Sequence, residues 1–188
     1  MISTLWTWLY WIWVGSEVVI AVATRTRRST GNVRDRGSML LLWIVILASI
    51  TACEWARYIV PASMFGGARW LRPAALAVLV AGLAIRWTAI LTLGKSFSAN
   101  VAIRESQTVH RTGLYRFVRH PSYLGLLLVF LAVGLHARNW VSLALAVVPP
   151  TFALLYRIHV EEKALREAFG EEYAAYSRET RRLVPGVF

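Results

Sequence analysis

Five long apolar runs constrain what this chain of 188 residues can fold into more than any other feature of its sequence. Several of these runs approach the length of about 20 mostly apolar residues that a helix needs to cross a bilayer. The sequence therefore predicts an all-α integral membrane protein with five transmembrane helices and a C-terminal helical segment, built as one domain. The predicted spans cover about residues 5–23, 39–60, 73–93, 121–136 and 140–158.

The charge of the chain is better explained by a membrane than by nucleic acid. The formal net charge of +11 would suggest a nucleic-acid partner in a soluble domain. Here the mean hydropathy is +0.50, and most arginines lie in loops between the apolar runs. Membrane topology and anionic lipid headgroups account for such a pattern, so no nucleic-acid partner is expected. The single cysteine, Cys53, excludes an intramolecular disulfide and a multi-cysteine metal site, and no metal is predicted.

The distribution of arginine predicts the orientation. Residues 24–37, 94–120 and 159–188 are polar and basic, and short basic loops stay on the cytoplasmic side of a membrane. With five spans, the N-terminus is expected outside and the C-terminus and active site in the cytoplasm, in the cell's inner or plasma membrane. The N-terminal residues carry no basic segment, so the first run is expected to remain a membrane helix and not a cleaved signal peptide.

Four charged residues fall inside the first three apolar runs. Glu17 is the only charge of the first run, while Glu54 and Arg57 are three residues apart and are expected to pair near the far membrane surface. Arg86 lies in the third run, and an arginine within a membrane is by default a hypothesis for a functional site, here for substrate binding. The alternative for Arg86 is snorkelling of its guanidinium to the interface.

The stretch GLYRFVRHPSYLG, residues 113–125, joins a basic loop to the fourth apolar run. Pro121 is favourable in the first turn of a helix, and His120 before it is pushed away from helical dihedrals. A helix is therefore predicted to begin at Pro121, with free N–H groups that open towards Arg119 and His120. Such a terminus can bind a carboxylate or phosphate; the alternative is a membrane helix with ordinary basic flanks.

A tight hairpin after His136 is predicted to bring this corner next to residues 157–162. Arg157 and Glu161 are four apart and share a helix face, whereas Glu162 can pair with Arg166 as a solvated bridge. Apolar residues of the tail recur at helical spacing, with Gly170 as the expected interruption. The pair Pro149-Pro150 should kink the fifth span and leave carbonyls that face protein or a cavity, which predicts a pocket beside this span.

The corner and the tail together resemble the isoprenylcysteine carboxyl methyltransferase family and its relatives, the membrane phospholipid N-methyltransferases. The first motif reads Arg119-His120-Pro121-Ser122-Tyr123-Leu124-Gly125. One hairpin later the second contains Arg157, Glu161-Glu162, Leu165, Phe169-Gly170, Tyr173, Tyr176 and a late Pro185. The upstream LGKSFSANV and Gly113-Leu114-Tyr115 are also similar to the family. The resemblance covers residues 93–185, about half of the chain.

The resemblance implies S-adenosyl-L-methionine as methyl donor, bound at the cytoplasmic face between the start of the fourth span and the C-terminal helix. The acceptor would be an amphiphilic or prenylated small molecule that enters from the membrane lipids, and no obligate protein partner is evident. Arg157 and Glu161 would be catalytic, and Arg86 and Arg157 would bind the substrate. The cofactor pocket would be lined by Tyr115, Arg119, His120, Pro121, Tyr123, Leu124, Gly125, Glu161 and Glu162.

These residue types suit methyl transfer, although several have a purely structural alternative. A glutamate can hold the cofactor's ammonium, and Arg119 with the helix N-terminus can hold its carboxylate. Gly125 allows close approach of either a ligand or a neighbouring helix. Tyr123 can stack on adenine or anchor the interface.

Other functions remain open at this point. They are a phospholipid amine N-methyltransferase, an NAD(P)H-dependent membrane reductase of the steroid-reductase type, and a non-catalytic protein whose basic face binds anionic lipid. The sequence lacks HExxH, Cys-x-x-Cys, P-loop and Gly-x-Ser-x-Gly motifs, which argues against metalloprotease, redox, nucleotide-hydrolase and esterase functions.

Overall fold

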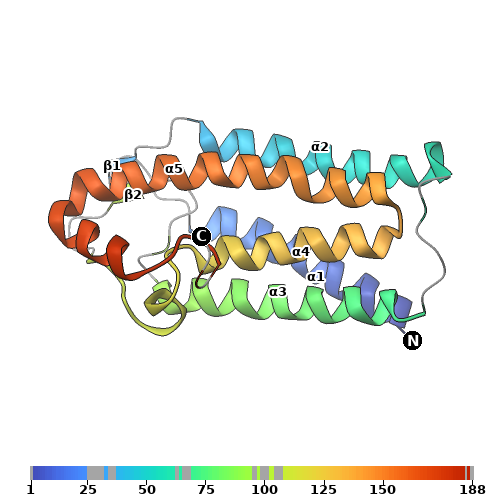
Figure 1. Cartoon of the computed structure of the whole chain (residues 1–188), viewed down its shortest axis with the longest axis horizontal. Helices are drawn as coiled ribbons and strands as arrows, with labels where there is room; N and C mark the ends of the chain where they lie inside the picture. The colour runs from blue at the N-terminus through green and yellow to red at the C-terminus, as the bar shows by residue number, and fades with distance from the viewer. Residues whose placement is uncertain are drawn as a thin grey trace.

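The computed structural model describes residues 2–24, 32–33, 37–61, 64, 69–94, 97, 102–103, 108–184 and 186. These residues form five α-helices, which Figure 1 shows side by side along one axis. Their bounds are α1 Ile2–Ala23, α2 Ser38–Ile59, α3 Leu71–Leu93, α4 Pro121–Ala137 and α5 Trp140–Glu179. A 3₁₀ turn, η3, covers Gly113–Arg116, and β1 (Asn32–Val33) pairs antiparallel with β2 (Ala102–Ile103). Some residues named in the sequence analysis lie outside the described residues. They are the arginines of the loop 24–37, and also Lys95, Arg104 and Pro185.

Length and composition support the prediction of a helical membrane protein. The helices α1, α2, α3 and α5 are long and apolar enough to cross a membrane, whereas α4 is an apolar helix of 17 residues. At 1.5 Å per residue, α4 is about 25 Å long. The all-α membrane fold is therefore confirmed, while a fifth span and the orientation of the chain stay predictions.

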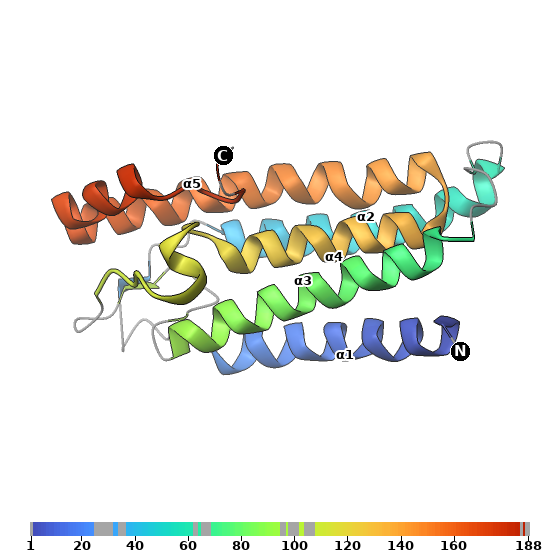
Figure 2. The same ribbon diagram turned by 60° about the horizontal axis from the view of Figure 1, so that its bottom comes forward.

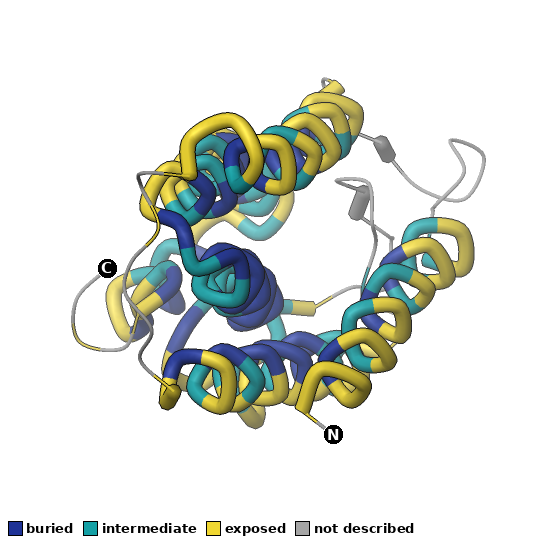
Figure 3. The backbone as a smooth tube through the Cα atoms, turned by 90° about the vertical axis from the view of Figure 1, so that its right-hand side faces the viewer, coloured by how far each residue is buried: buried dark blue, intermediate teal, exposed yellow. Residues whose placement is uncertain are grey.

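The helix α4 lies innermost in the bundle. It packs against α3 and α5, α2 lies along α5, and α1 lies along α3 (Figure 2). In Figure 3 one tube coloured mostly as buried lies within a ring of partly exposed helices. Ten of the 17 residues of α4 are buried. A helix that is apolar on all its faces is expected to be surrounded by protein in this way.

Local chemistry explains why α4 and α5 form a hairpin. α4 begins at Pro121, as predicted, after His120 with non-helical dihedrals of φ −125° and ψ 56°. Asn139, fully buried between the helices, caps α5 by accepting a hydrogen bond from the Ser142 backbone N–H at 2.9 Å. Its side-chain amide also donates to the Val60 carbonyl at 2.9 Å and so fixes the hairpin against the end of α2.

The helix α5 contains both the predicted fifth span and the predicted C-terminal helical segment. It continues past residue 158 and ends at Glu179. The residue inside it that leaves helical geometry is Gly170, with φ 51° and ψ −124°, and not Pro149 or Pro150. Figure 2 shows the last turns of α5 folded back towards the bundle. The interruption at Gly170 is thus confirmed, while the kink expected at the proline pair stays a prediction.

Candidate functional site

The C-terminal residues 180–184, here called the C-terminal strap, hold the corner that precedes α4. The Arg119 and His120 backbone N–H groups donate to the Arg181 and Arg182 carbonyls at 2.7 and 3.0 Å. In return, the Arg181 N–H donates to the Phe117 carbonyl at 3.2 Å. The C-terminal strap therefore reaches the start of α4 and fixes the backbone that presents Arg119 and His120.

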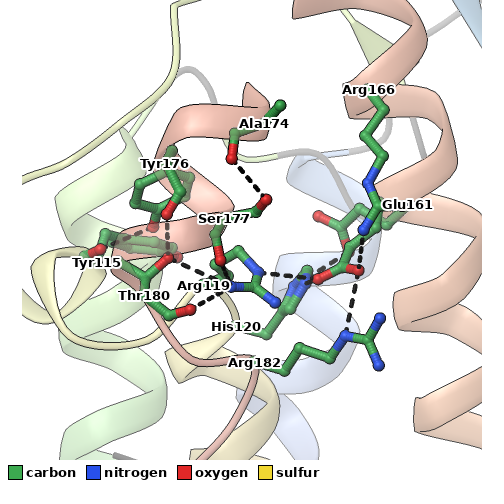
Figure 4. A network of polar contacts seen from close by, with 11 residues as sticks. Tyr115, Arg119, His120, Glu161, Arg166, Ala174, Tyr176, Ser177, Thr180 and Arg182 are labelled. Carbon is green, nitrogen blue, oxygen red and sulfur yellow. Dashed lines mark hydrogen bonds and ion pairs between the residues drawn. The ribbon is translucent and has the colours of Figure 1, made fainter. Parts of the chain in front are cut away.

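Glu162 is the centre of an ion-pair cluster beneath this corner. Its carboxylate lies 2.9 Å from Arg119 Nε, 3.2 Å from Arg182 Nε and 3.5 Å from Arg166. Figure 4 shows these three arginines with His120. The predicted pair of Glu162 with Arg166 is therefore present, but the Glu162 side chain is only 4% exposed, so the pair is not a solvated bridge. Burial raises the pKa of Glu162, but the contacts with His120 and Arg119 outweigh it and lower the pKa to about 2.

Arg119 is occupied by internal partners. Besides Glu162, its NH1 donates to the carbonyls of Ser177 and Thr180. It therefore ties α5 to the C-terminal strap across the site (Figure 4). A guanidinium that links a buried carboxylate with two carbonyls has a structural task, whatever further contact it makes with a ligand.

Glu161, next to Glu162 in sequence, lies in a different environment. Its side chain is 31% exposed, and its Oε2 accepts a hydrogen bond from the Tyr123 hydroxyl at 2.8 Å. Arg157 donates from Nε to the same hydroxyl at 3.4 Å and from NH1 to Ser38 Oγ at 2.7 Å. Arg157 and Glu161 therefore share a helix face, as predicted, and both side chains contact the Tyr123 hydroxyl.

Two buried polar atoms beside these carboxylates have no hydrogen-bond partner within the described part of the chain. His120 Nε2 lies 3.5 Å from Glu162 with poor geometry, in a side chain that is 4% exposed and stacked on Tyr123. The other is the Tyr173 hydroxyl, in a residue that is 2% exposed. Buried polar groups are rarely left unpaired, so these atoms suit contact with a polar ligand. Tyr173 was not among the predicted site residues, and only its place in the second motif indicated it.

The other predicted cofactor residues lie around this cluster and pack internally. The Tyr115 hydroxyl donates to the Ala89 carbonyl at 3.3 Å, and the Tyr115 carbonyl accepts from the Tyr176 hydroxyl at 2.7 Å. Pro121 is buried and Leu124 half-buried on the first turns of α4. A Cβ added to Gly125 would lie 2.6 Å from the Arg86 backbone nitrogen. The geometry favours the helix-packing interpretation of Gly125.

Tyr123 also lines an apolar cavity of about 280 Å³. Residues of α1 and α2 form most of its wall, including the aromatic side chains of Trp11, Trp13 and Trp43. Because Trp11 and Leu47 are also exposed at the bundle surface, the cavity reaches the outside between α1 and α2. The cavity meets the fifth span at Arg157, and a separate open pocket beside the same span is lined by Val148 and Pro149. The prediction of a pocket beside this span is therefore confirmed.

Arg86 lies in the wall of this cavity in a buried ion pair. Its Nε and NH2 donate to the two carboxylate oxygens of Glu17 at 2.9 and 2.8 Å, and both residues are buried. Arg86 therefore does not snorkel to the interface. Sequence reasoning missed its partner, although Glu17 was the only charge of the first run. The predicted pair of Glu54 with Arg57 is confirmed at 2.8 Å.

The fold and the site define a helical membrane protein in which one tyrosine, Tyr123, contacts Glu161 beside the ion-pair cluster and also lines an apolar cavity. The sequence model of the isoprenylcysteine carboxyl methyltransferase (ICMT) family matches residues 75–167. The chain is 34% identical over 178 residues to protein-S-isoprenylcysteine O-methyltransferase A of Arabidopsis thaliana, covering 92% of this chain and 87% of that one. The chain belongs to the isoprenylcysteine carboxyl methyltransferase family.

Two further comparisons agree with this assignment. Protein-S-isoprenylcysteine O-methyltransferase B of Arabidopsis thaliana is 35% identical over 121 residues, 63% of this chain and 61% of that protein. The solved structure of the eukaryotic intramembrane Ras methyltransferase ICMT aligns with a TM-score of 0.64 at 26% identity. That alignment covers 77% of this chain and 52% of the solved one, so the present chain spans about half of that structure's length.

Proposed function

We propose that this protein is an S-adenosyl-L-methionine-dependent methyltransferase that methylates the carboxylate of a lipid-like acceptor, of the isoprenylcysteine type named for its relatives. The observation that carries the proposal is the position of Tyr123. Its hydroxyl bonds Glu161 at the ion-pair cluster, while Tyr123 also lines the apolar cavity with Arg86 and Arg157. A site for a polar donor and a site for an apolar acceptor thus share one side chain.

The residues on the cluster side fit the proposed cofactor. Glu161 is partly exposed and suits the cofactor's ammonium, whereas Glu162 is already paired with arginines. His120 Nε2 and the Tyr173 hydroxyl supply unpartnered polar atoms nearby. When bound, the cofactor supplies a methyl group on a positively charged sulfur. The role of the chain's own residues is to bind and orient it and to exclude water from it.

The residues on the cavity side fit an amphiphilic acceptor. Arg86 and Arg157 form the polar end of a cavity whose other walls are apolar and aromatic. A carboxylate acceptor is already deprotonated, so these residues need only orient it and no general base is required. Positioning of two reactants can supply several kcal/mol of the barrier reduction. The outlet between α1 and α2 supports entry of the acceptor from the lipid.

The topology belongs to the same proposal. We infer five spans with the N-terminus outside and the cluster at the cytoplasmic face. The basic loops support this orientation. The short α4 fits as a span because protein surrounds it, and a helix inside a bundle needs no lipid-facing surface of full length.

Two measurements test the proposal. S-adenosylhomocysteine, the product of methyl donation, should raise the thermal stability of the purified protein, by about 2.7 kcal/mol at a hundredfold excess over Kd. NADPH serves as the control and should have no effect. Labelled methyl transfer should then proceed to a prenyl-cysteine mimic with a free carboxylate and not to its methyl ester. Stabilisation by NADPH instead, or equal transfer to an amine lipid, would contradict the proposal.

A further inference from the structure

Glu17 is a buried carboxylate that the proposed chemistry has not used. Only three residues of α1 are buried, namely Trp6, Trp13 and Glu17, and Glu17 is the only charged one. Ionisable groups within a membrane are costly, and a buried ion pair recovers little of that cost as stability. The buried charge of Glu17 therefore indicates a function other than attaching α1 to the bundle.

The hydrogen bonds of Arg86 with Glu17 and Ser122 fix the orientation of its planar guanidinium group. Glu17 accepts from both Nε and NH2, and NH1 of Arg86 donates to the Ser122 carbonyl at 3.3 Å. Three of the five N–H groups of Arg86 thus have acceptors. The other two have no acceptor among the described residues, in a side chain that lines the apolar cavity.

The contact with Ser122 connects this pair to the proposed methyl-transfer site. Ser122 lies in the first turn of α4, directly before Tyr123. Glu17, Arg86 and the backbone before Tyr123 therefore form one continuous chain of contacts from α1 to the residue that both lines the cavity and bonds Glu161.

We propose that Glu17 is a positioning residue for the acceptor: it holds Arg86 so that the two remaining N–H groups bind the acceptor's carboxylate. This inference rests on the proposed function, because it names the residue that orients the acceptor in that same site. Glu17 does not touch the reacting atoms. It keeps a bidentate orientation of Arg86 and balances its charge, which prevents an uncompensated cation in the cavity wall.

The structure offers a matched control for simple docking of α1. Ser16, the neighbour of Glu17, accepts a hydrogen bond from Trp87 Nε1 at 3.2 Å and so also links α1 to α3. This link is neutral and leaves Arg86 untouched. Ser16→Ala therefore weakens the attachment of α1 without altering the orientation of the guanidinium. Glu54→Gln, in an exposed pair on α2, controls for loss of any glutamate from a membrane helix.

The test measures binding of a labelled prenyl-cysteine mimic to the full-length protein in the presence of S-adenosylhomocysteine. Glu17→Gln is expected to weaken binding of the mimic at least tenfold, to leave the Kd for S-adenosylhomocysteine within about twofold, and to raise KM for the mimic more than it lowers kcat. Glu17→Asp should recover part of the affinity, whereas Ser16→Ala and Glu54→Gln should bind like the unaltered protein.

The outcomes separate this inference from the proposed function. Unchanged binding of the mimic by Glu17→Gln would overturn the inference while leaving the methyltransferase proposal intact. An equal loss in Ser16→Ala and Glu17→Gln would also overturn it, because attachment of α1 would then explain both. Failure of the unaltered protein to bind S-adenosylhomocysteine would instead count against the proposed function. If Glu17→Gln does not fold, Glu17→Asp and Ser16→Ala decide between the same alternatives.

Discussion

At the scale of single residues, neighbouring glutamates in α5 have different partners and therefore different expected roles. Glu162 is buried among three arginines, so Glu162→Gln should leave cations without their counter-charge and destabilise the protein by about 3 kcal/mol or more. The measurement is thermal unfolding in detergent. Glu54→Gln, which breaks an exposed pair with Arg57, is the control and should cost less than about 1 kcal/mol. Equal losses in both variants would contradict the account.

The same carboxylate predicts an acid limit of stability. The pKa of Glu162 is lowered to about 2 from the ordinary value of 4.5. Its charged form therefore contributes stability above about pH 4.5, and that contribution is lost as the pH falls from there towards 2. His120, Arg119, Arg166 and Arg182 are the charged or titratable groups that face it. The melting temperature of Glu162→Gln should fall less across this window than that of the unaltered protein; parallel curves would refute this.

Sequence reasoning located these residues but not their partners. Helical spacing placed Arg157 and Glu161 on one face, and both contact the Tyr123 hydroxyl. Helical spacing also predicted the pair of Glu162 with Arg166, because it relates only residues within one helix. The stronger partner, Arg119, comes from 43 residues away along the chain. Glu17 and Arg86 are 69 residues apart, so only tertiary packing brings them together.

At the scale of helices, the contact between α3 and α4 depends on small residues. A Cβ added to Gly125 would lie 2.6 Å from the Arg86 backbone nitrogen, and one added to Gly82 would lie 2.8 Å from the Gly125 carbonyl oxygen. Gly125→Ala should therefore push the helices apart and lower the melting temperature by several degrees. Gly15→Ala on α1, where a Cβ meets nothing within 4 Å, should be neutral or slightly stabilising. A tolerated Gly125→Ala would show that α3 and α4 pack less closely.

The ends of the helices could be predicted only where local chemistry decides them. Pro121 begins α4 because its ring fixes φ and it lacks an N–H, and Gly170 interrupts α5 with a positive φ. The continuation of α5 beyond residue 158 could not be read from polarity. A change from apolar to polar residues marks the edge of a membrane, not the end of a helix. The backbone hydrogen bonds of a helix can continue beyond that edge.

At the scale of the whole molecule, the proposed topology places the two ends of the bundle on opposite sides of the membrane. Cys53 is fully buried, so single exposed cysteines can be introduced after Cys53→Ser. A membrane-impermeant thiol reagent should label Trp70→Cys in intact cells and Glu179→Cys only after permeabilisation, since the two positions lie before α3 and at the end of α5. Labelling of both positions in intact cells, or the reverse order, would refute five spans with the N-terminus outside.

In the proposed function, Glu161 and its neighbours at the start of α4 bind the methyl donor. Equilibrium binding of labelled S-adenosylhomocysteine to the purified protein tests it most directly. We expect saturable binding, a loss of at least tenfold in affinity for Glu161→Ala, and unchanged affinity for Glu54→Ala, whose side chain lies in the exposed pair on α2. Absence of binding by the unaltered protein, or equal affinity in all three proteins, would contradict the claim.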